Sequence, residues 1–245
     1  MAVFEYLKRD AVSHADMLDP LSRGTGEVIY EGEDGVIFRE TLSGIYFASM
    51  EDVEKCLAIL GKYQATAFAV HQERTAKMLQ QRHHFPEYHP CHQYVYPADT
   101  FGEAEMKHTG IDSRRLEQVQ LLGAKYRDIV DRNYDAMDDP EYIGELIERK
   151  QLWGIFEQGE LAGFIGQHLE GSMGLLEVLP QYRNKGCGKI LEAFLIRRTL
   201  SQGRRPFCQV FEGNETSARL QERLGMVCSS EKTWWLFGDQ AAEDR

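Results

Sequence analysis

The stretch that decides the fold is GLLEVLPQYRNKGCGKILEAFL, residues 174–195, because it joins a buried-strand pattern, a glycine-rich turn and a helical pattern without a gap. The apolar run from Leu175 to Val178 predicts a short strand. Pro180 ends this strand, since proline supplies no amide hydrogen to a sheet. Apolar residues then recur at helical spacing from Ile190 to Leu195, which predicts an amphipathic helix.

Two glycines, Gly186 and Gly188, lie where this helix is expected to begin. The first amides of a helix have no partner within the helix, and the helix dipole is positive at that end. Phosphate oxygens bind at such a helix start, and residues without a Cβ atom let the backbone approach them closely. The turn is therefore predicted to bind an anion.

Two common phosphate-binding motifs do not fit these positions. A Walker loop requires a glycine where Arg183 stands and a serine or threonine where Ile190 stands. A dinucleotide fingerprint accepts Gly186 and Gly188 but requires a third glycine where Leu191 stands. A different phosphate-containing ligand is therefore expected.

The residues after this helix add a further strand and helix. The segment 207–211 predicts a strand, Gly213 and Asn214 predict a turn, and the segment 217–224 predicts a helix. Gly225 follows at the position where glycine commonly ends a helix. The second half of the chain thus reads as strand, phosphate turn, helix, strand and helix.

The pattern Arg183-x-x-Gly186-x-Gly188, directly after a strand and a proline, resembles the coenzyme A diphosphate loop of the GNAT superfamily of acetyl-CoA-dependent N-acyltransferases. The superfamily's second coenzyme motif is matched by Asn214, Ser217 and Leu224-Gly225-Met226. The segments LEVLPQYRNKGCGKIL and PFCQVFEGN are most similar to the FR47-type and glycine N-acyltransferase-like branch. The resemblance implies an α/β (α+β) GNAT fold, in which helices flank a mixed central sheet.

The same resemblance implies which residues bind acetyl-CoA or another short acyl-CoA as co-substrate. In the superfamily the central strand and the asparagine of the second motif contact the pantetheine arm, and the loop binds the diphosphate. The matching positions are Leu176, Val178, Arg183, Asn184, Lys185, Gly186, Cys187, Gly188, Lys189, Asn214 and Ser217. The backbone amide of Val178 is expected to stabilise the charge that develops on the acyl oxygen.

The implied reaction moves an acetyl or short acyl group to the primary amine of a small molecule. Free amines carry a proton at neutral pH, so a base or a water chain must remove it. Glu177 is the carboxylate nearest to Val178 and is the candidate base, with Glu170 and Glu212 as more distant alternatives. Deprotonation through water is the other alternative.

The chain departs from the superfamily at the usual acid and base positions. Gln221 stands where the superfamily has a proton-donating tyrosine, and an amide cannot give up a proton. Ser172 and Gln209 stand where some members have a base glutamate. An acyl-CoA-binding sensor or partner-binding module without turnover is therefore the alternative to an enzyme.

Residues 1–105 show an order of elements like that of the second half but no paired glycines, so we expect a degenerate GNAT-like domain without a cofactor site. Residues 101–110 are expected to be a linker, and residues 111–245 the catalytic acyl-CoA-binding domain. The elements predicted for the first half are a helix over 4–18, strands over 28–30, 36–38 and 45–47, a helix over 53–60 capped by Asp52, a strand over 67–70, a helix over 75–82 and a strand over 94–96.

The catalytic half is expected to open with a strand over 111–116 and helices over 121–133 and 139–150, the second started by Asp139 and Pro140. A hairpin of strands over 152–156 and 161–169 follows. In the superfamily these two helices usually form the acceptor side. The residues there that are suited to meet an amine are Tyr126, Asp131, Tyr134 and Asp138.

Four histidines surround Cys91 in HHFPEYHPCH, residues 83–92. Imidazole and thiolate are zinc ligands, but this spacing fits no common zinc motif. The two prolines of the segment predict a surface loop, and no metal site is expected. The 5 cysteines of the chain are odd in number and scattered, which predicts no disulfide framework.

The net charge of −11 argues against a nucleic-acid-binding surface and is compatible with a basic amine substrate. The sequence has neither the pattern of a signal peptide nor an apolar run of membrane-spanning length. We therefore expect a cytoplasmic monomer or homodimer that binds a small-molecule amine, and neither nucleic acid nor membranes.

Overall fold

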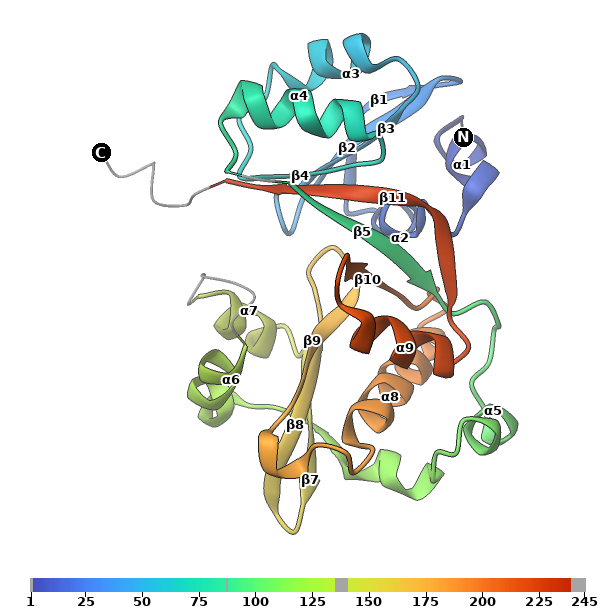
Figure 1. The fold of residues 1–245 in the computed structure, drawn as a ribbon, viewed down its shortest axis with the longest axis vertical. Coiled ribbons are helices and arrows are strands. Elements are labelled where there is room, and N and C mark those ends of the chain that lie inside the picture. Colours follow the sequence, from blue (N-terminus) through green and yellow to red (C-terminus); the bar gives the residue numbers. More distant parts are fainter. Residues whose placement is uncertain (1, 87, 135–140, 239–245) are drawn as a thin grey trace. The chain divides into compact units, whose positions relative to one another are not determined.

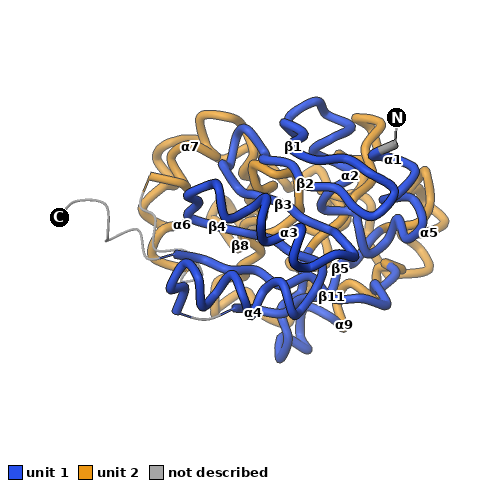
Figure 2. The backbone as a smooth tube through the Cα atoms, turned by 90° about the horizontal axis from the view of Figure 1, so that it is seen from above, with its two compact units in different colours: residues 1–95, 209–218, 227–245 blue, residues 96–208, 219–226 orange. Residues whose placement is uncertain are grey.

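The computed structural model describes residues 2–86, 88–134 and 141–238 (Figure 1). The chain divides into two compact units, residues 1–95, 209–218 and 227–245 and residues 96–208 and 219–226 (Figure 2). The sequence analysis expects domains at 1–105 and 111–245. The division of the structure differs from these bounds because the last strand of the chain is part of the sheet of the first unit.

The first unit is built on one sheet with strands in the order β1-β2-β3-β4-β11-β5. Neighbouring strands are antiparallel except for β3 and β4, which are parallel. The strands are β1 Gly26–Gly32, β2 Gly35–Glu40, β3 Tyr46–Met50, β4 Ala67–Val70, β5 Tyr88–Val95 and β11 Val227–Phe237. The helices are α1 Ala2–Leu7, the 3₁₀ helix Lys8–Asp10, α2 Ala15–Arg23, α3 Val53–Leu60 and α4 Glu73–His83.

Side chains of this sheet alternate between two apolar cores, as the twofold period of a strand requires. Ile37 and Phe68 point to the core formed with α3 and α4. Their neighbours Phe38 and Ala69 point to the opposite core, formed with α1 and α2. Helices therefore cover both faces of the sheet (Figure 1).

A buried polar group lies between the start of α2 and the sheet. His14 Nε2 is 2.9 Å from Ser49 Oγ, and the ring centroids of His14 and His71 are 4.8 Å apart. His71 Nε2 in turn lies 3.2 Å from Asp16 Oδ1. Burial, and then the charge of His71, lowers the pKa of His14 to about 4.

The second unit has strands in the order β10-β9-β8-β7-β6. β10 and β9 are parallel, and the other neighbours are antiparallel. The strands are β6 Val119–Leu121, β7 Leu152–Glu157, β8 Glu160–Gln167, β9 Met173–Val178 and β10 Phe207–Phe211. The helices are α5 Glu103–His108, α6 Arg127–Asn133, α7 Tyr142–Glu148, α8 Cys187–Ser201 and α9 Glu215–Arg223, with 3₁₀ helices at Ser113–Gln118, Ala124–Tyr126 and Pro180–Tyr182. β10 and α9 cross the boundary between the units.

The strands of the second unit are covered on both faces. Val130 of α6 and Leu146 of α7 are buried in one cluster with Phe164 of β8 and Leu175 of β9. α8 packs against β8 and β9, and it lies on the other side of these strands from α6 and α7 (Figure 1). The apolar face of α8 is thus held against the strand that precedes it, which fixes where the helix begins.

Several predicted elements are confirmed. The strands over 28–30, 36–38 and 45–47 lie within β1, β2 and at the start of β3. Asp52 caps α3, where its Oδ1 accepts the Lys55 amide at 3.0 Å. The predicted hairpin is the pair β7 and β8, and the helix predicted after Gly186 is α8.

Three predictions around the helices are wrong. The helix predicted over 4–18 ends at Leu7, and the chain passes through a 3₁₀ turn before α2 begins at Ala15. The predicted linker contains α5, which Glu105 stabilises by accepting the Gly102 amide at 2.7 Å. The strand predicted over 111–116 is mostly a 3₁₀ helix. In the second and third cases a local side-chain cap, which produces no apolar period in the sequence, accounts for the difference.

The last part of the histidine-rich segment is a strand and not a surface loop. Residues from Tyr88 onward form β5, and Cys91 is fully buried where it pairs with Thr233 of β11. In the described ranges, no group of three His, Cys, Asp or Glu side chains is placed to hold a metal ion. The predicted helix start at Asp139 and Pro140 lies outside the described residues. No helix in the part of the chain that the structure covers is long and apolar enough to cross a bilayer.

A buried carboxyl group lies between α8 and α9. Gln221 Nε2 donates to Glu192 Oε1 at 2.8 Å, and the two residues are 2% and 3% exposed. Glu192 Oε2 and Gln221 Oε1 are buried and have no hydrogen-bond partner among the residues that the structure describes. Burial raises the pKa of Glu192 to about 7, although the Gln221 amide partly opposes this shift.

Acidification is expected to destabilise the protein through His14. Between pH 6.5 and about 4 the unfolded chain binds a proton that the folded chain does not, so up to about 3 kcal/mol of the free energy of unfolding is lost over this range. Urea unfolding midpoints measured across this range test it. His14→Gln should flatten the pH dependence, whereas the exposed His108→Gln should not. Equal slopes in wild type and His14→Gln would contradict the assignment.

Glu192 is expected to act in the opposite direction. Its raised pKa means that stability is full below about pH 4.5 and is lost as the pH rises to about 7, by up to about 3 kcal/mol. Glu192→Gln keeps the shape and the acceptor for Gln221 but cannot ionise, so it should be more stable than wild type at pH 8. Denaturant unfolding at pH 5 and pH 8 measures the difference. Glu222→Gln, an exposed change on α9, is the matched control.

Candidate functional site

β9 contains a bulge. Gly174 pairs with Gly166 of β8 and Glu177 pairs with Phe164, so three steps along β9 match two along β8. Leu175 takes up the extra residue with a φ of 53°, a left-handed value that is uncommon for leucine. Its side chain is nevertheless buried, which anchors the bulge in the core.

After the bulge, β9 has a free edge. β9 and β10 pair at Met173 and Cys208, and no later pair joins these strands in the described residues. Leu179 donates its amide to Ala162 beside β8 at 3.0 Å. Because amides alternate between the two edges of a strand, the amide of Val178 points away from β8. This is the amide that the sequence analysis expects to face the acyl oxygen.

The loop between β9 and α8 has two residues in left-handed conformation. Asn184 has a φ of 63° and Gly186 a φ of 80°. Asparagine tolerates this region better than most residues, and glycine adopts it without steric penalty. The residue types in the loop therefore match the backbone that the turn requires.

The start of α8 presents amides without helical partners. The first helical hydrogen bond runs from the Ile190 amide to the Gly186 carbonyl at 3.1 Å, and no side chain in the described ranges caps the helix. The amides of Cys187, Gly188 and Lys189 precede this bond. α8 is 15 residues long, so its dipole is fully developed at these amides. These are the amides of the turn for which the sequence analysis predicts anion binding.

Gly188 brings the helix start against the end of β9. A Cβ atom on this residue would lie 3.5 Å from Val178 Cγ2 and 3.8 Å from Leu176 Cδ2. The structure thus brings together three predicted cofactor contacts from the strand and the helix. A diphosphate at these amides would have the free edge of β9 beside it.

The basic side chains of the loop are engaged with the protein. Lys189 Nζ donates to the carbonyl oxygens of Thr109 at 2.6 Å and Gly110 at 3.2 Å. Arg183 donates through Nε to the Val178 carbonyl at 3.0 Å, and its guanidinium pairs with Glu177. Lys185 Nζ lies 5.1 Å from the Tyr182 ring centroid. Backbone amides, rather than Lys189 or Arg183, are therefore the available anion donors.

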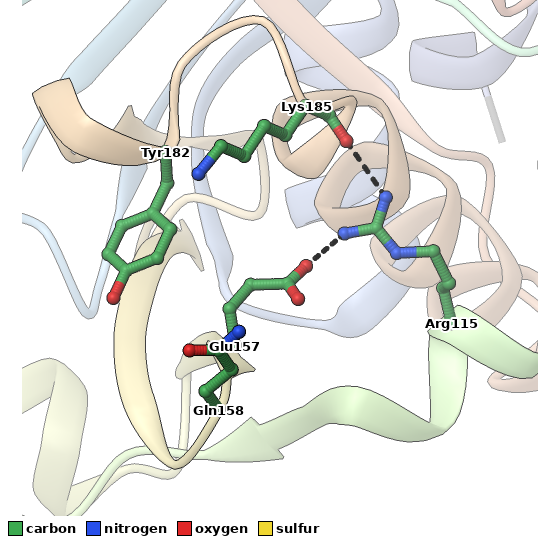
Figure 3. A pocket seen from close by; sticks show the side chains of 5 residues that line it. All are labelled: Arg115, Glu157, Gln158, Tyr182 and Lys185. Carbon is green, nitrogen blue, oxygen red and sulfur yellow. Dashed lines mark hydrogen bonds and ion pairs between the residues drawn. The ribbon is translucent and has the colours of Figure 1, made fainter.

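Arg115 braces the loop, and no sequence motif marks it. Its guanidinium donates to the Lys185 carbonyl at 2.9 Å and pairs with Glu157. Cys187 Sγ lies 3.7 Å from the same guanidinium and is 1% exposed, so it is a buried side chain rather than a reactive thiol. A cavity of about 390 Å³ lies beside these residues, lined by Arg115, Glu157, Gln158, Tyr182 and Lys185 (Figure 3).

Of the second predicted motif, Asn214 and Ser217 lie in the first unit and Leu224-Gly225-Met226 lie in the second. Asn214 Oδ1 accepts the Ser217 amide at 3.1 Å, so the asparagine caps α9. This bond leaves the side-chain amide nitrogen of the exposed Asn214 to donate elsewhere. Gln221, farther along α9, is buried against Glu192. It is therefore part of the packing between helices.

The candidate carboxylates differ in their partners. Glu177 pairs with Arg183 at 3.0 Å and is partly exposed. Glu212 forms an ion pair with Lys232. Glu170 is 4% exposed and accepts a hydrogen bond from Ser172, the residue that stands at a base position of the superfamily. None of the three is a solvent-facing carboxylate without a partner.

The acceptor-side residues inside the described part are Tyr126, Asp131 and Tyr134, and Asp138 lies outside it. Asp131 lies 3.6 Å from Arg127 on the surface of α6. Tyr134 follows α6, and burial together with the charge of Glu170 raises its pKa to about 12. Its phenol therefore stays protonated at neutral pH, so it can donate a hydrogen bond but cannot act as a base.

Comparison with known families agrees with this arrangement. Residues 152–236, which run from β7 into β11, match the model of the family described as FR47-like protein. A search of the curated proteins gives no match to the sequence.

Solved structures with the same fold span most of the chain. A Drosophila protein has a TM-score of 0.58 at 16% identity, over 83% of this chain and 73% of its own. A protein of Novosphingobium aromaticivorans assigned to the GNAT family of acetyltransferases has a TM-score of 0.53 at 17% identity, over 93% and 96%. A GCN5-related N-acetyltransferase of Kribbella flavida has a TM-score of 0.53 at 13% identity, over 94% and 95%. These likenesses show that the chain has the fold of solved GNAT-family acetyltransferases and that its residues 152–236 are similar to the FR47-like family.

Proposed function

We propose that the protein is an N-acyltransferase that moves an acetyl or short acyl group from coenzyme A to the primary amine of a small molecule. The observation that carries this proposal is the uncapped start of α8 beside the free edge of β9. An anion-binding helix start alone accepts many phosphates. A strand edge with free amides next to it suits a ligand whose diphosphate continues into an amide-containing arm, as in coenzyme A.

Each group of residues has a proposed role. The amides of Cys187, Gly188 and Lys189 would bind the diphosphate, and the edge amides of Leu176 and Val178 would bind the arm and the acyl oxygen. The bound acyl-CoA supplies an activated thioester. Asn214 and Ser217 are proposed to bind the arm as in the superfamily, and no metal is needed for this chemistry.

An acyl-CoA-binding sensor without turnover is the second candidate. Gln221 is buried against Glu192 and cannot donate a proton to a leaving thiolate. The predicted base Glu177 is already paired with Arg183. Each observation argues against one expected catalytic group, and neither affects the residues that are proposed to bind the acyl-CoA.

Release of free thiol separates the two functions. Purified protein is incubated with acetyl-CoA and a panel of small primary amines that covers amino acids, polyamines and aromatic amines, and the thiol is titrated with a chromogenic disulfide. An acyltransferase should release thiol above the amine-free rate with at least one amine, and mass spectrometry should detect the acylated amine. Acetyl-CoA binding by calorimetry without thiol release across the panel would favour the sensor.

Gly186→Glu tests the cofactor site. The added carboxylate would lie at the amides that bind the diphosphate, and we expect acetyl-CoA affinity to fall at least about 100-fold. Gly203→Glu is the matched control, because Gly203 also has a left-handed φ, 71°, but follows the other end of α8. It introduces a similar strain and the same charge, and it should retain the wild-type affinity. Calorimetric titration of both variants, with thermal unfolding as a check of folding, measures the contrast. Wild-type affinity in a folded Gly186→Glu variant would contradict the site.

A further inference from the structure

An imidazole is held at the start of β9 by a tyrosine of α7. Tyr142 Oη lies 2.7 Å from His168 Nδ1, and the two rings stack with centroids 5.9 Å apart. The turn that carries His168 is closed by two backbone bonds, from the His168 amide to the Ser172 carbonyl at 2.8 Å and from the Gly171 amide to the His168 carbonyl at 2.9 Å. One ring nitrogen thus has a fixed partner, and the ring is held in one orientation.

The other ring nitrogen lies against the bulge. A Cβ atom on Gly174 would overlap with His168 Nε2, so only glycine at this position lets the imidazole lie over the strand. Gly174 directly precedes Leu175, the bulged residue, and stands two positions before Leu176, a predicted contact of the acyl-CoA arm. His168 Nε2 therefore lies close to the part of β9 where its pairing with β10 ends.

No hydrogen bond occupies Nε2 within the described ranges of the chain, and His168 is half-buried. An imidazole has an ordinary pKa close to neutral pH, which suits a group that must accept a proton under physiological conditions. Glu177 and Glu212, by contrast, are tied to Arg183 and Lys232.

Titratable and charged groups lie around the turn that carries His168. Glu170 is enclosed in the same turn as His168, and its charge contributes to raising the pKa values of Tyr134 and Tyr142, for which burial is the larger cause. The two phenols therefore stay neutral. The guanidinium of Arg204 is the opposing charge of the turn, and it donates to the Gly171 carbonyl at 3.3 Å.

We propose that His168 is the general base of the transfer reaction and that Tyr142 is its positioning residue, an inference that rests on the proposed acyltransferase function. The amine nitrogen bonds to the thioester carbonyl carbon and gives its proton to His168 Nε2, the carbon–sulfur bond breaks, and the thiolate takes up a proton from the imidazolium or from solvent. The reactive tautomer has its hydrogen on Nδ1, which donates to Tyr142 Oη.

Rate profiles test the assignment. His168→Gln is expected to lower kcat at pH 7.5 about 100-fold, to leave acetyl-CoA affinity within about twofold, and to abolish the rise of kcat with pH that deprotonation of an imidazole produces. Tyr142→Phe should lower kcat about 10-fold and shift that rise along the pH axis. His108→Gln on α5, a histidine far from β9 in sequence and exposed, is the matched control and should keep the wild-type profile. Free imidazole should restore part of the rate to His168→Ala.

A measurement without turnover supplements the kinetics. Nitrogen-15 chemical shifts of the His168 ring in wild type, assigned by comparison with His168→Gln, report which nitrogen carries the hydrogen. A hydrogen on Nδ1 at neutral pH supports the proposal, and a permanent hydrogen on Nε2 overturns it.

Failure of the His168 assignment can be distinguished from failure of the proposed acyltransferase function. If wild type turns over and His168→Gln keeps its rate and pH profile, the acyltransferase stands and the role of His168 falls. If Glu177→Gln lowers the rate and His168→Gln does not, the role of His168 is likewise refuted. If wild type binds acetyl-CoA and releases no thiol with any amine, the transfer itself and the base are both refuted.

Discussion

The extra residue in β9 is the constraint on which the candidate site depends. A regular strand would continue to pair on both edges, and its amides would be used up by the sheet. Leu175 interrupts the register with β8, and within the described residues β9 pairs with β10 only at Met173 and Cys208. The left-handed φ of Leu175 costs free energy, of the order of 1 kcal/mol. Burial of its side chain in the core with α6 and α7 offsets that cost.

The second requirement is the start of α8, which no side chain of the described residues caps. Most helices of globular proteins satisfy their first amides with a side chain. Here Gly186 provides no cap, and the nearby cations of Arg183 and Lys189 bind carbonyl groups and a carboxylate instead. The positive character of the site thus comes from oriented backbone dipoles, which do not reorganise when a ligand binds. A strongly acidic chain can bind an anion in this way because the local field, and not the net charge, acts at contact distance.

Proton chemistry in the second unit depends on groups that are only partly accessible. Glu192 and Glu170 are buried and Tyr134 and Tyr142 are half-buried, and their pKa values or partners are set by packing. His168 differs because one nitrogen is held by Tyr142 and the other faces the bulged strand. The superfamily's tyrosine position has instead become part of the packing, where Gln221 binds Glu192 between α8 and α9.

The sequence alone determined the elements whose signal is local. The strand that ends at Pro180, the glycine turn, α8 and the cap Asp52 follow from period, proline and capping chemistry, and they were predicted with nearly the right bounds. The tertiary structure decided what depends on partners distant in sequence. Cys91 is in a strand because β11 pairs with it, Arg115 braces the loop 70 residues later, and His168 meets Tyr142 and Gly174 only after the turn and the bulge have formed. Such contacts produce no periodic pattern in the sequence, because only folding brings the residues that make them together.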